Sequence, residues 1–122
     1  MKRLIIDIDD TISHTIAGDY ENAIPNNELI SKMRLYKEMG FEIVLNTSRN
    51  MRTYDRNIGR INLNTIPILV NWLKRFDVPC DELYVGKPWC GEEGFYIDDK
   101  AVRPSEFVEL SYNEIRDLLN LK

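Results

Sequence analysis

Short apolar runs alternate with amphipathic stretches along this chain. The run at residues 2–8 is rich in β-branched side chains and has no turn residue, so it predicts a strand buried on both faces. Shorter apolar runs at residues 41–45, 82–85 and 95–97 predict three further strands. Each of the four runs is followed by polar or charged residues. The pattern therefore predicts strands whose ends carry reactive side chains.

Three amphipathic stretches predict helices between and after these strands. Residues suited to N-capping precede them: Asn26 or Asn27, Asn64 or Thr65, and Ser111. Gly40 is expected to end the first helix and Pro79 the second, whereas residues 50–62 are expected to form a polar loop. The order β-α-β-α-β-β-α predicts a single α/β domain over residues 1–122, with a three-layer α/β/α Rossmann-like sheet that is mostly parallel.

Charge and composition narrow the range of partners. The chain has 16 Lys and Arg against 20 Asp and Glu, and the net charge of -4 predicts neither a nucleic-acid partner nor an anionic membrane. The apolar run near the N-terminus is interrupted at Asp7, too early for a signal peptide or a membrane span, so we expect a cytoplasmic protein. Cys80 and Cys90 lack metal-site spacing, and we expect free thiols.

The first strand end contains two closely spaced carboxylates. Asp7 and Asp9 are two positions apart, so alternation along a strand points both side chains in one direction. Two carboxylates in one small volume either share a proton or bind a cation, and oxygen ligands favour magnesium over zinc. The alternative is that both acids face solvent or cap the next segment. The motif alone favours neither this alternative nor a cation site.

The other strand ends add complementary groups. Thr47 and Ser48 offer hydroxyl groups, Lys87 offers a compact cation, and Asp98 with Asp99 could complete a metal site. Each of these alone fits an ordinary turn or surface residue. Together they lie at predicted strand ends that share one edge of the sheet, where ligands bind in such folds. They are the residue types that phosphoryl transfer through an aspartyl-phosphate needs.

These motifs, in this order, resemble the haloacid dehalogenase-like (HAD) superfamily. The resemblance implies a phosphatase in which Asp7 is the nucleophile, Asp9 is the general acid and then the base, and Lys87 steadies the phosphoryl charge. It implies phosphate or substrate contacts from Thr11, Thr47, Ser48 and Arg49. It implies Mg²⁺ bound by Asp7, by Asp98 and Asp99 with Asp99 as the direct ligand, and by either the Ile8 backbone carbonyl or Asp9.

The resemblance also bears on the substrate. The intervals between the motifs are filled by predicted core elements, which implies a superfamily member that has no cap domain and has an open site. Such a member could form a homo-oligomer. Runs at residues 46–52, 85–89 and 96–100 are similar to small bacterial proteins of capsule or surface-polysaccharide biosynthesis, which implies a small-molecule phosphate ester such as a sugar or polyol phosphate. Tyr20 and the arginines of residues 49–60 lie in loops that could contact the leaving group.

Other functions fit parts of the pattern. An open site also suits a phosphatase that acts on a polynucleotide end or a phosphoprotein. A receiver-like phosphoacceptor domain has similar residues, but there the phosphorylated aspartate precedes the hydroxyl and the lysine, whereas here an acid pair follows Lys87. A catalytically silent binding module is disfavoured because all four charged motif positions are intact.

Overall fold

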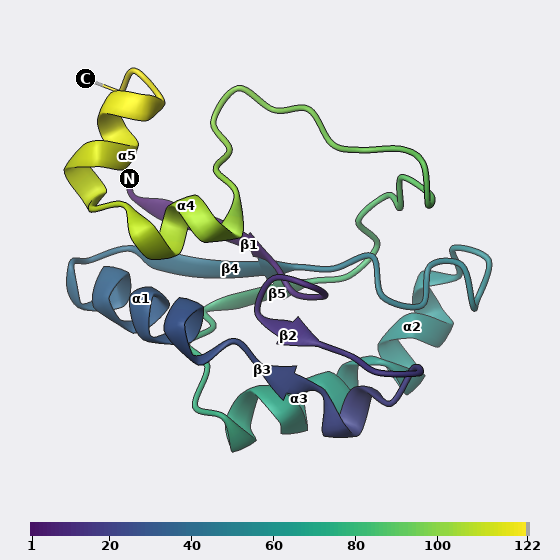
Figure 1. Ribbon diagram of the computed structural model, residues 1–122. Helices are drawn as coiled ribbons and strands as arrows, with labels where there is room; N and C mark the ends of the chain where they lie inside the picture. The colour runs from purple at the N-terminus through teal and green to yellow at the C-terminus, as the bar shows by residue number, and fades with distance from the viewer. Residues whose placement is uncertain (122) are drawn as a thin grey trace. The chain divides into compact units, whose positions relative to one another are not determined.

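Three parallel strands form the main sheet of the computed structural model, which describes residues 1–121. They are β1 (Arg3–Asp7), β4 (Glu42–Asn46) and β5 (Glu82–Tyr84), in the order β1-β4-β5 (Figure 1). Since the strands are parallel, their carboxyl ends lie at one edge of the sheet. A mixed α/β fold with a mostly parallel sheet is therefore confirmed.

The residues fall into two compact units, Met1–Trp89 and the segment from Cys90 onward, and each is described by itself. The first unit contains the three-stranded sheet, a small antiparallel pair and three α-helices. The remaining elements of this unit are β2 (Ser13–His14), η1 (Tyr20–Asn22), β3 (Ile24–Pro25), α1 (Asn27–Glu38), α2 (Ile58–Asn64) and α3 (Ile66–Arg75). In Figure 1, α1 and α3 both lie below the sheet.

Local sequence signals account for α1. The Asn26 side chain accepts a hydrogen bond from the Leu29 backbone N–H at 3.2 Å, as an N-cap does, and Gly40 follows the helix with a φ of 95°. The expected apolar stripe is buried and consists of Leu29, Ile30, Met33 and Tyr36. It packs with β-strand residues Ile43 and Leu45, which are fully buried in the core of the unit. The predicted position of this helix is thus confirmed.

Strand β1 is less buried than predicted. Ile5 is 65% exposed, and within the described residues β1 pairs with no strand other than β4. A strand is buried on both faces only when other elements cover each face of its sheet, and here α1 and α3 both lie on one face (Figure 1). The expectation of a strand buried on both faces was wrong, and β1 is in addition an edge strand of this sheet.

Two further expectations were wrong. Residues 95–97 do not form a strand: Phe95, Tyr96 and Ile97 are 78%, 53% and 88% exposed, and the described part of the second unit contains no strand that could pair with them. Helix α2 occupies the end of a stretch expected to be a loop. There the Asn57 side chain accepts from the Arg60 backbone N–H at 3.1 Å and caps a helix that buries Ile61.

The second unit contains two short helices, α4 (Pro104–Glu109) and α5 (Tyr112–Leu118). The predicted capping box at the start of α5 is present, with the Ser111 hydroxyl accepting from Glu114 N at 3.1 Å and the Glu114 carboxylate accepting from Ser111 N at 2.9 Å. Among the described residues, no helix is long and apolar enough to cross a membrane.

Candidate active site

The ends of the three parallel strands bring Asp7 and Lys87 together. The Lys87 Nζ atom lies 3.3 Å from Asp7 Oδ1, although the two residues are 80 positions apart in the chain. Backbone hydrogen bonds continue beyond the strands, from Thr47 N to Tyr84 O at 3.0 Å and from Lys87 N to Thr47 O at 3.1 Å. The loops after β4 and β5 are thereby held side by side, and Lys87 is directed toward the end of β1.

A glycine permits this turn toward the site. Gly86 has a φ of 83°, a left-handed conformation that glycine adopts without strain. A Cβ atom at this position would also lie 2.8 Å from the Ile58 Cδ1 atom. The backbone angle therefore favours glycine immediately before Lys87, whereas the methyl group of Ile58 lies at the end of a flexible side chain and could shift.

The electrostatics of Asp7 are set by opposing influences. Partial burial raises the pKa of its carboxyl group above the ordinary value, while the charge and hydrogen bond of Lys87 and a 3.2 Å hydrogen bond from the Thr11 hydroxyl act to lower it. The negative charge of Asp9 acts in the same direction as burial. A second positive charge beside Asp7, such as a bound cation, would favour its ionised form.

A tight turn follows β1 and determines where Asp9 and Thr11 point. The Ile8 carbonyl oxygen accepts hydrogen bonds from the backbone N–H groups of residues 11, 12 and 13, at 3.2, 2.9 and 3.1 Å, and Asp10 has a φ of 60°. These donors engage the Ile8 oxygen within the turn, and whether Ile8 or Asp9 would bind the metal stays a prediction. The turn also returns the Thr11 hydroxyl to Asp7.

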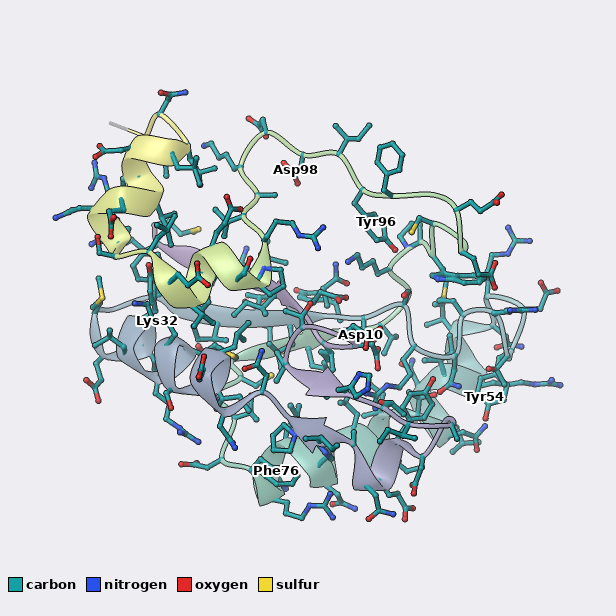
Figure 2. All side chains as sticks on the ribbon, in the orientation of Figure 1. Asp10, Lys32, Tyr54, Phe76, Tyr96 and Asp98 are labelled. Carbon is teal, nitrogen blue, oxygen red and sulfur yellow. The ribbon has the colours of Figure 1, made fainter. Side chains whose placement is uncertain are left out.

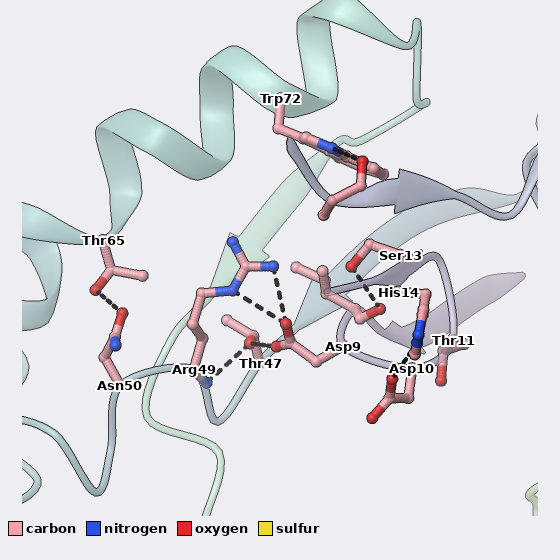
Figure 3. Close-up of polar contacts among 12 residues, drawn as sticks. Asp9, Asp10, Thr11, Ser13, His14, Thr47, Arg49, Asn50, Thr65 and Trp72 are labelled. Carbon is pink, nitrogen blue, oxygen red and sulfur yellow. Dashed lines mark hydrogen bonds and ion pairs between the residues drawn. The ribbon is translucent and has the colours of Figure 1, made fainter. Parts of the chain in front are cut away.

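Asp9 is held at both carboxylate oxygens (Figure 3). Thr47 Oγ1 donates to Asp9 Oδ2 at 3.0 Å, and the guanidinium of Arg49 donates to Asp9 Oδ1 through Nε at 3.1 Å and Nη2 at 2.9 Å. Thr47 Oγ1 in turn accepts from Arg49 N at 2.9 Å. Thr47 and Arg49, both predicted to contact phosphate, thus contact Asp9 in this structure.

This network is largely shielded from water. The Arg49 side chain is 2% exposed and Thr47 is fully buried, whereas the Asp9 side chain is 31% exposed. The guanidinium of Arg49 lies over the ring of Tyr20, with Cζ 4.2 Å from the ring centroid. Burial, and next the charge of Asp9, raise the pKa of the Tyr20 hydroxyl, which Arg49 opposes.

The remaining predicted residues lie elsewhere. Ser48 is half-buried, and its carbonyl accepts from Met51 N at 3.0 Å. Asp98 and Asp99 belong to the second unit, in an exposed segment where Lys100 N donates to Asp98 Oδ1 at 3.2 Å (Figure 2). That backbone hydrogen bond, and next a hydrogen bond with the Asp99 side chain, lower the pKa of Asp98. Their predicted role as metal ligands stays a prediction.

The oxygen donors of the first unit suit magnesium. Within residues 1–121, no group of three or more His, Cys, Asp or Glu side chains is placed to hold a metal ion. Mg²⁺ commonly keeps several waters and binds through one or two carboxylates plus substrate phosphates. Asp7 offers such a carboxylate, 32% exposed, with the Thr11 hydroxyl as a further oxygen 3.2 Å away, so the residues present fit this kind of site.

Comparison with known proteins finds one close structural counterpart. A crystal structure of an MCSG target from Vibrio cholerae is 52% identical in sequence, covers 98% of this chain and 98% of its own, and superposes with a TM-score of 0.96. No protein-family model matches the chain, and no curated protein matches it.

Proposed function

This chain belongs to the same protein family as the Vibrio cholerae target, and we propose that it is a magnesium-dependent phosphatase of the HAD type. The proposed reaction is hydrolysis of a phosphate monoester through an aspartyl-phosphate on Asp7. The observation that supports it most is the contact between Asp7 and Lys87 at the shared edge of the sheet. A nucleophilic carboxylate beside a cation, with the second acid Asp9 two residues later, meets the needs of phosphoryl transfer.

The proposed chemistry assigns one task to each residue. An Asp7 oxygen attacks phosphorus, so an O–P bond to Asp7 forms while the ester P–O bond breaks. Asp9 gives a proton to the departing alcohol oxygen and then takes one from the water that hydrolyses the aspartyl-phosphate. Lys87 and a bound Mg²⁺ would offset the negative charge that gathers on the phosphoryl oxygens.

The number of domains and the layers of the fold are part of the same proposal. We infer a single domain over residues 1–122 with a three-layer α/β/α Rossmann-like arrangement and no cap domain. The parallel β1-β4-β5 order supports the sheet of this arrangement, and α1 and α3 would supply one of its two helical layers. Asp98 and Asp99 are proposed as further ligands of the metal. A small sugar or polyol phosphate is the proposed substrate class, with a homo-oligomer and a cytoplasmic location as accompanying proposals.

Phosphate release tests the proposal directly. The protein is assayed with Mg²⁺ against a panel of sugar, polyol, nucleotide and peptide phosphates, alongside Asp7→Asn and the matched control Asp10→Asn. Asp10 is a suitable control because its side chain is 81% exposed and asparagine tolerates its positive φ. We expect turnover in the wild type and in Asp10→Asn, and none in Asp7→Asn or after EDTA treatment. Turnover that survives Asp7→Asn or EDTA would contradict the proposal.

A further inference from the structure

A buried arginine beside a proposed catalytic acid needs a physical explanation. Arg49 is 2% exposed, and burying a guanidinium is unfavourable unless its charge and N–H groups are satisfied. Two of its nitrogens donate to the same oxygen of Asp9, and its guanidinium carbon lies over the ring of Tyr20. The cation therefore contacts both the Asp9 carboxylate and an aromatic ring.

The geometry separates two possible roles for Arg49. A phosphate ligand should present N–H groups to the open part of the site, as bidentate phosphate recognition requires. Here Nε and Nη2 are both directed at Asp9 Oδ1, while Thr47 holds the other carboxylate oxygen. Donors at both oxygens leave the Asp9 carboxylate little freedom to rotate. A positioning role for Arg49 follows more directly from these contacts than a phosphate-binding role.

Tyr20 is itself held firmly on the first unit. It begins the short helix η1, and Ala23 N closes that turn on Tyr20 O at 3.3 Å. Trp72 of α3 is buried and donates from Nε1 to Ala23 O at 2.9 Å, and Arg75 donates to the Glu21 carbonyl. The loop that supplies the ring is thus bound to α3 through two of its backbone carbonyls, which anchors the backbone next to Tyr20.

We propose that Tyr20 and Arg49 form a positioning pair that holds the Asp9 carboxylate in its working orientation. This inference rests on the proposed phosphatase activity and adds two residues that act through Asp9 rather than on the substrate. The aromatic face of Tyr20, not its hydroxyl, is the part that matters, because the guanidinium lies over the ring. Arg49 is required for its two guanidinium N–H donors to Asp9, because the single ammonium group of lysine cannot reproduce their planar arrangement.

Kinetic constants of paired variants test the role. Tyr20→Leu removes the ring, Tyr20→Phe keeps it, and Arg49→Lys keeps the charge without the fork. We expect kcat of Tyr20→Leu and Arg49→Lys to fall about 10- to 100-fold, as displacement of a catalytic group does, with KM changed by less than about twofold. Tyr20→Phe should keep most of the wild-type kcat. An unchanged kcat with a raised KM, or equal damage in Tyr20→Phe and Tyr20→Leu, would overturn the pair.

A spectroscopic readout keeps the test independent of turnover. The Nε–H of Arg49 donates to Asp9, so it should give a slowly exchanging ¹H–¹⁵N signal in the wild type and in Tyr20→Phe. Tyr20→Leu should broaden or lose this signal. The matched control is Tyr112→Leu, which removes a ring at 5.6 Å from the guanidinium of Arg116 and should leave both the signal and kcat unchanged.

The two proposals can fail separately. A wild type that releases phosphate, an inactive Asp7→Asn and a fully active Tyr20→Leu would overturn the positioning pair and leave the phosphatase proposal standing. A wild type without phosphatase activity on any substrate would refute the proposed function. In that case, loss of the Arg49 signal in Tyr20→Leu would still support the pair, and an unaffected signal would overturn it.

Discussion

Removing the Asp9 carboxylate should destabilise the folded protein, because the Arg49 guanidinium would then be buried without its counter-charge. Deleting one partner of a buried ion pair costs about 3–5 kcal/mol. The Arg49 side chain is 2% exposed but that of Asp9 is 31% exposed, so water can reach part of the gap. We therefore expect Asp9→Ala to lower the free energy of unfolding by about 2–3 kcal/mol, which for a chain of this size lowers the melting temperature by about 10 °C.

A double-mutant cycle shows whether the loss comes from the unpaired charge. Arg49→Met replaces the buried cation by an apolar side chain of similar length, and it leaves Asp9 able to hydrate through its exposed side. The double variant Asp9→Ala with Arg49→Met should therefore be more stable than the sum of the single losses predicts, with a coupling energy of about 1–2 kcal/mol.

Urea unfolding, followed by far-UV circular dichroism and by tryptophan fluorescence, measures these differences. Asp10→Asn, which changes an exposed neighbouring carboxylate, should stay within about 0.5 kcal/mol of the wild type. The reasoning would be refuted if Asp9→Ala cost less than about 0.5 kcal/mol or if the losses at Asp9 and Arg49 were simply additive.

Three further changes test other parts of the structure. Lys87→Met should lower kcat for phosphate release about 10²- to 10³-fold by removing the cation at the site. Asp81→Asn should cost about 1 kcal/mol in urea unfolding at pH 7, because a hydrogen bond from Ile43 N, and next the pairing with a lysine, lower the Asp81 pKa. A lowered pKa gives stability that is fully present above the unfolded value of 3.8 and is lost as pH falls through the folded value, which lies below 3.8. The difference between wild type and Asp81→Asn should therefore persist down to pH 3.8 and shrink below it; a difference that shrinks already between about pH 6 and pH 5, or that does not shrink below pH 3.8, would contradict this assignment. Trp72→Phe should cost about 1–3 kcal/mol, because it leaves the buried Ala23 carbonyl without its donor, and thermal unfolding would show it; an unchanged melting temperature would count against that hydrogen bond.

Short-range signals in the sequence were sufficient for several elements. The cap at Asn26 and the apolar stripe after it predicted α1, and the S-x-x-E pattern at Ser111 predicted the start of α5. These features depend on residues three or four positions apart, so a short segment of the sequence is enough to predict them. The same locality explains one failure, because residues 95–97 have the composition of a strand, and a strand also requires a partner for its backbone groups.

The candidate site shows the same division. Parallel strands end at a common edge, so their order along the sequence was enough to predict that Asp7 and Lys87 would meet there. The sequence indicated Tyr20 only as a residue of a flanking loop and Arg49 as a phosphate or substrate contact, and no local pattern pairs either of them with Asp9.

What the sequence determined by itself was three of the four predicted strand ends and the chemical groups that follow them, since periodicity and caps depend on neighbouring residues. What only the tertiary structure decided was the burial of Arg49 against Tyr20, its pairing with Asp9, and the exposed edge of β1. These features depend on which layers and loops meet in space. Residues some 30 to 40 positions apart in the chain contain no local sequence pattern that predicts their contact, so the contact becomes apparent only in the folded protein.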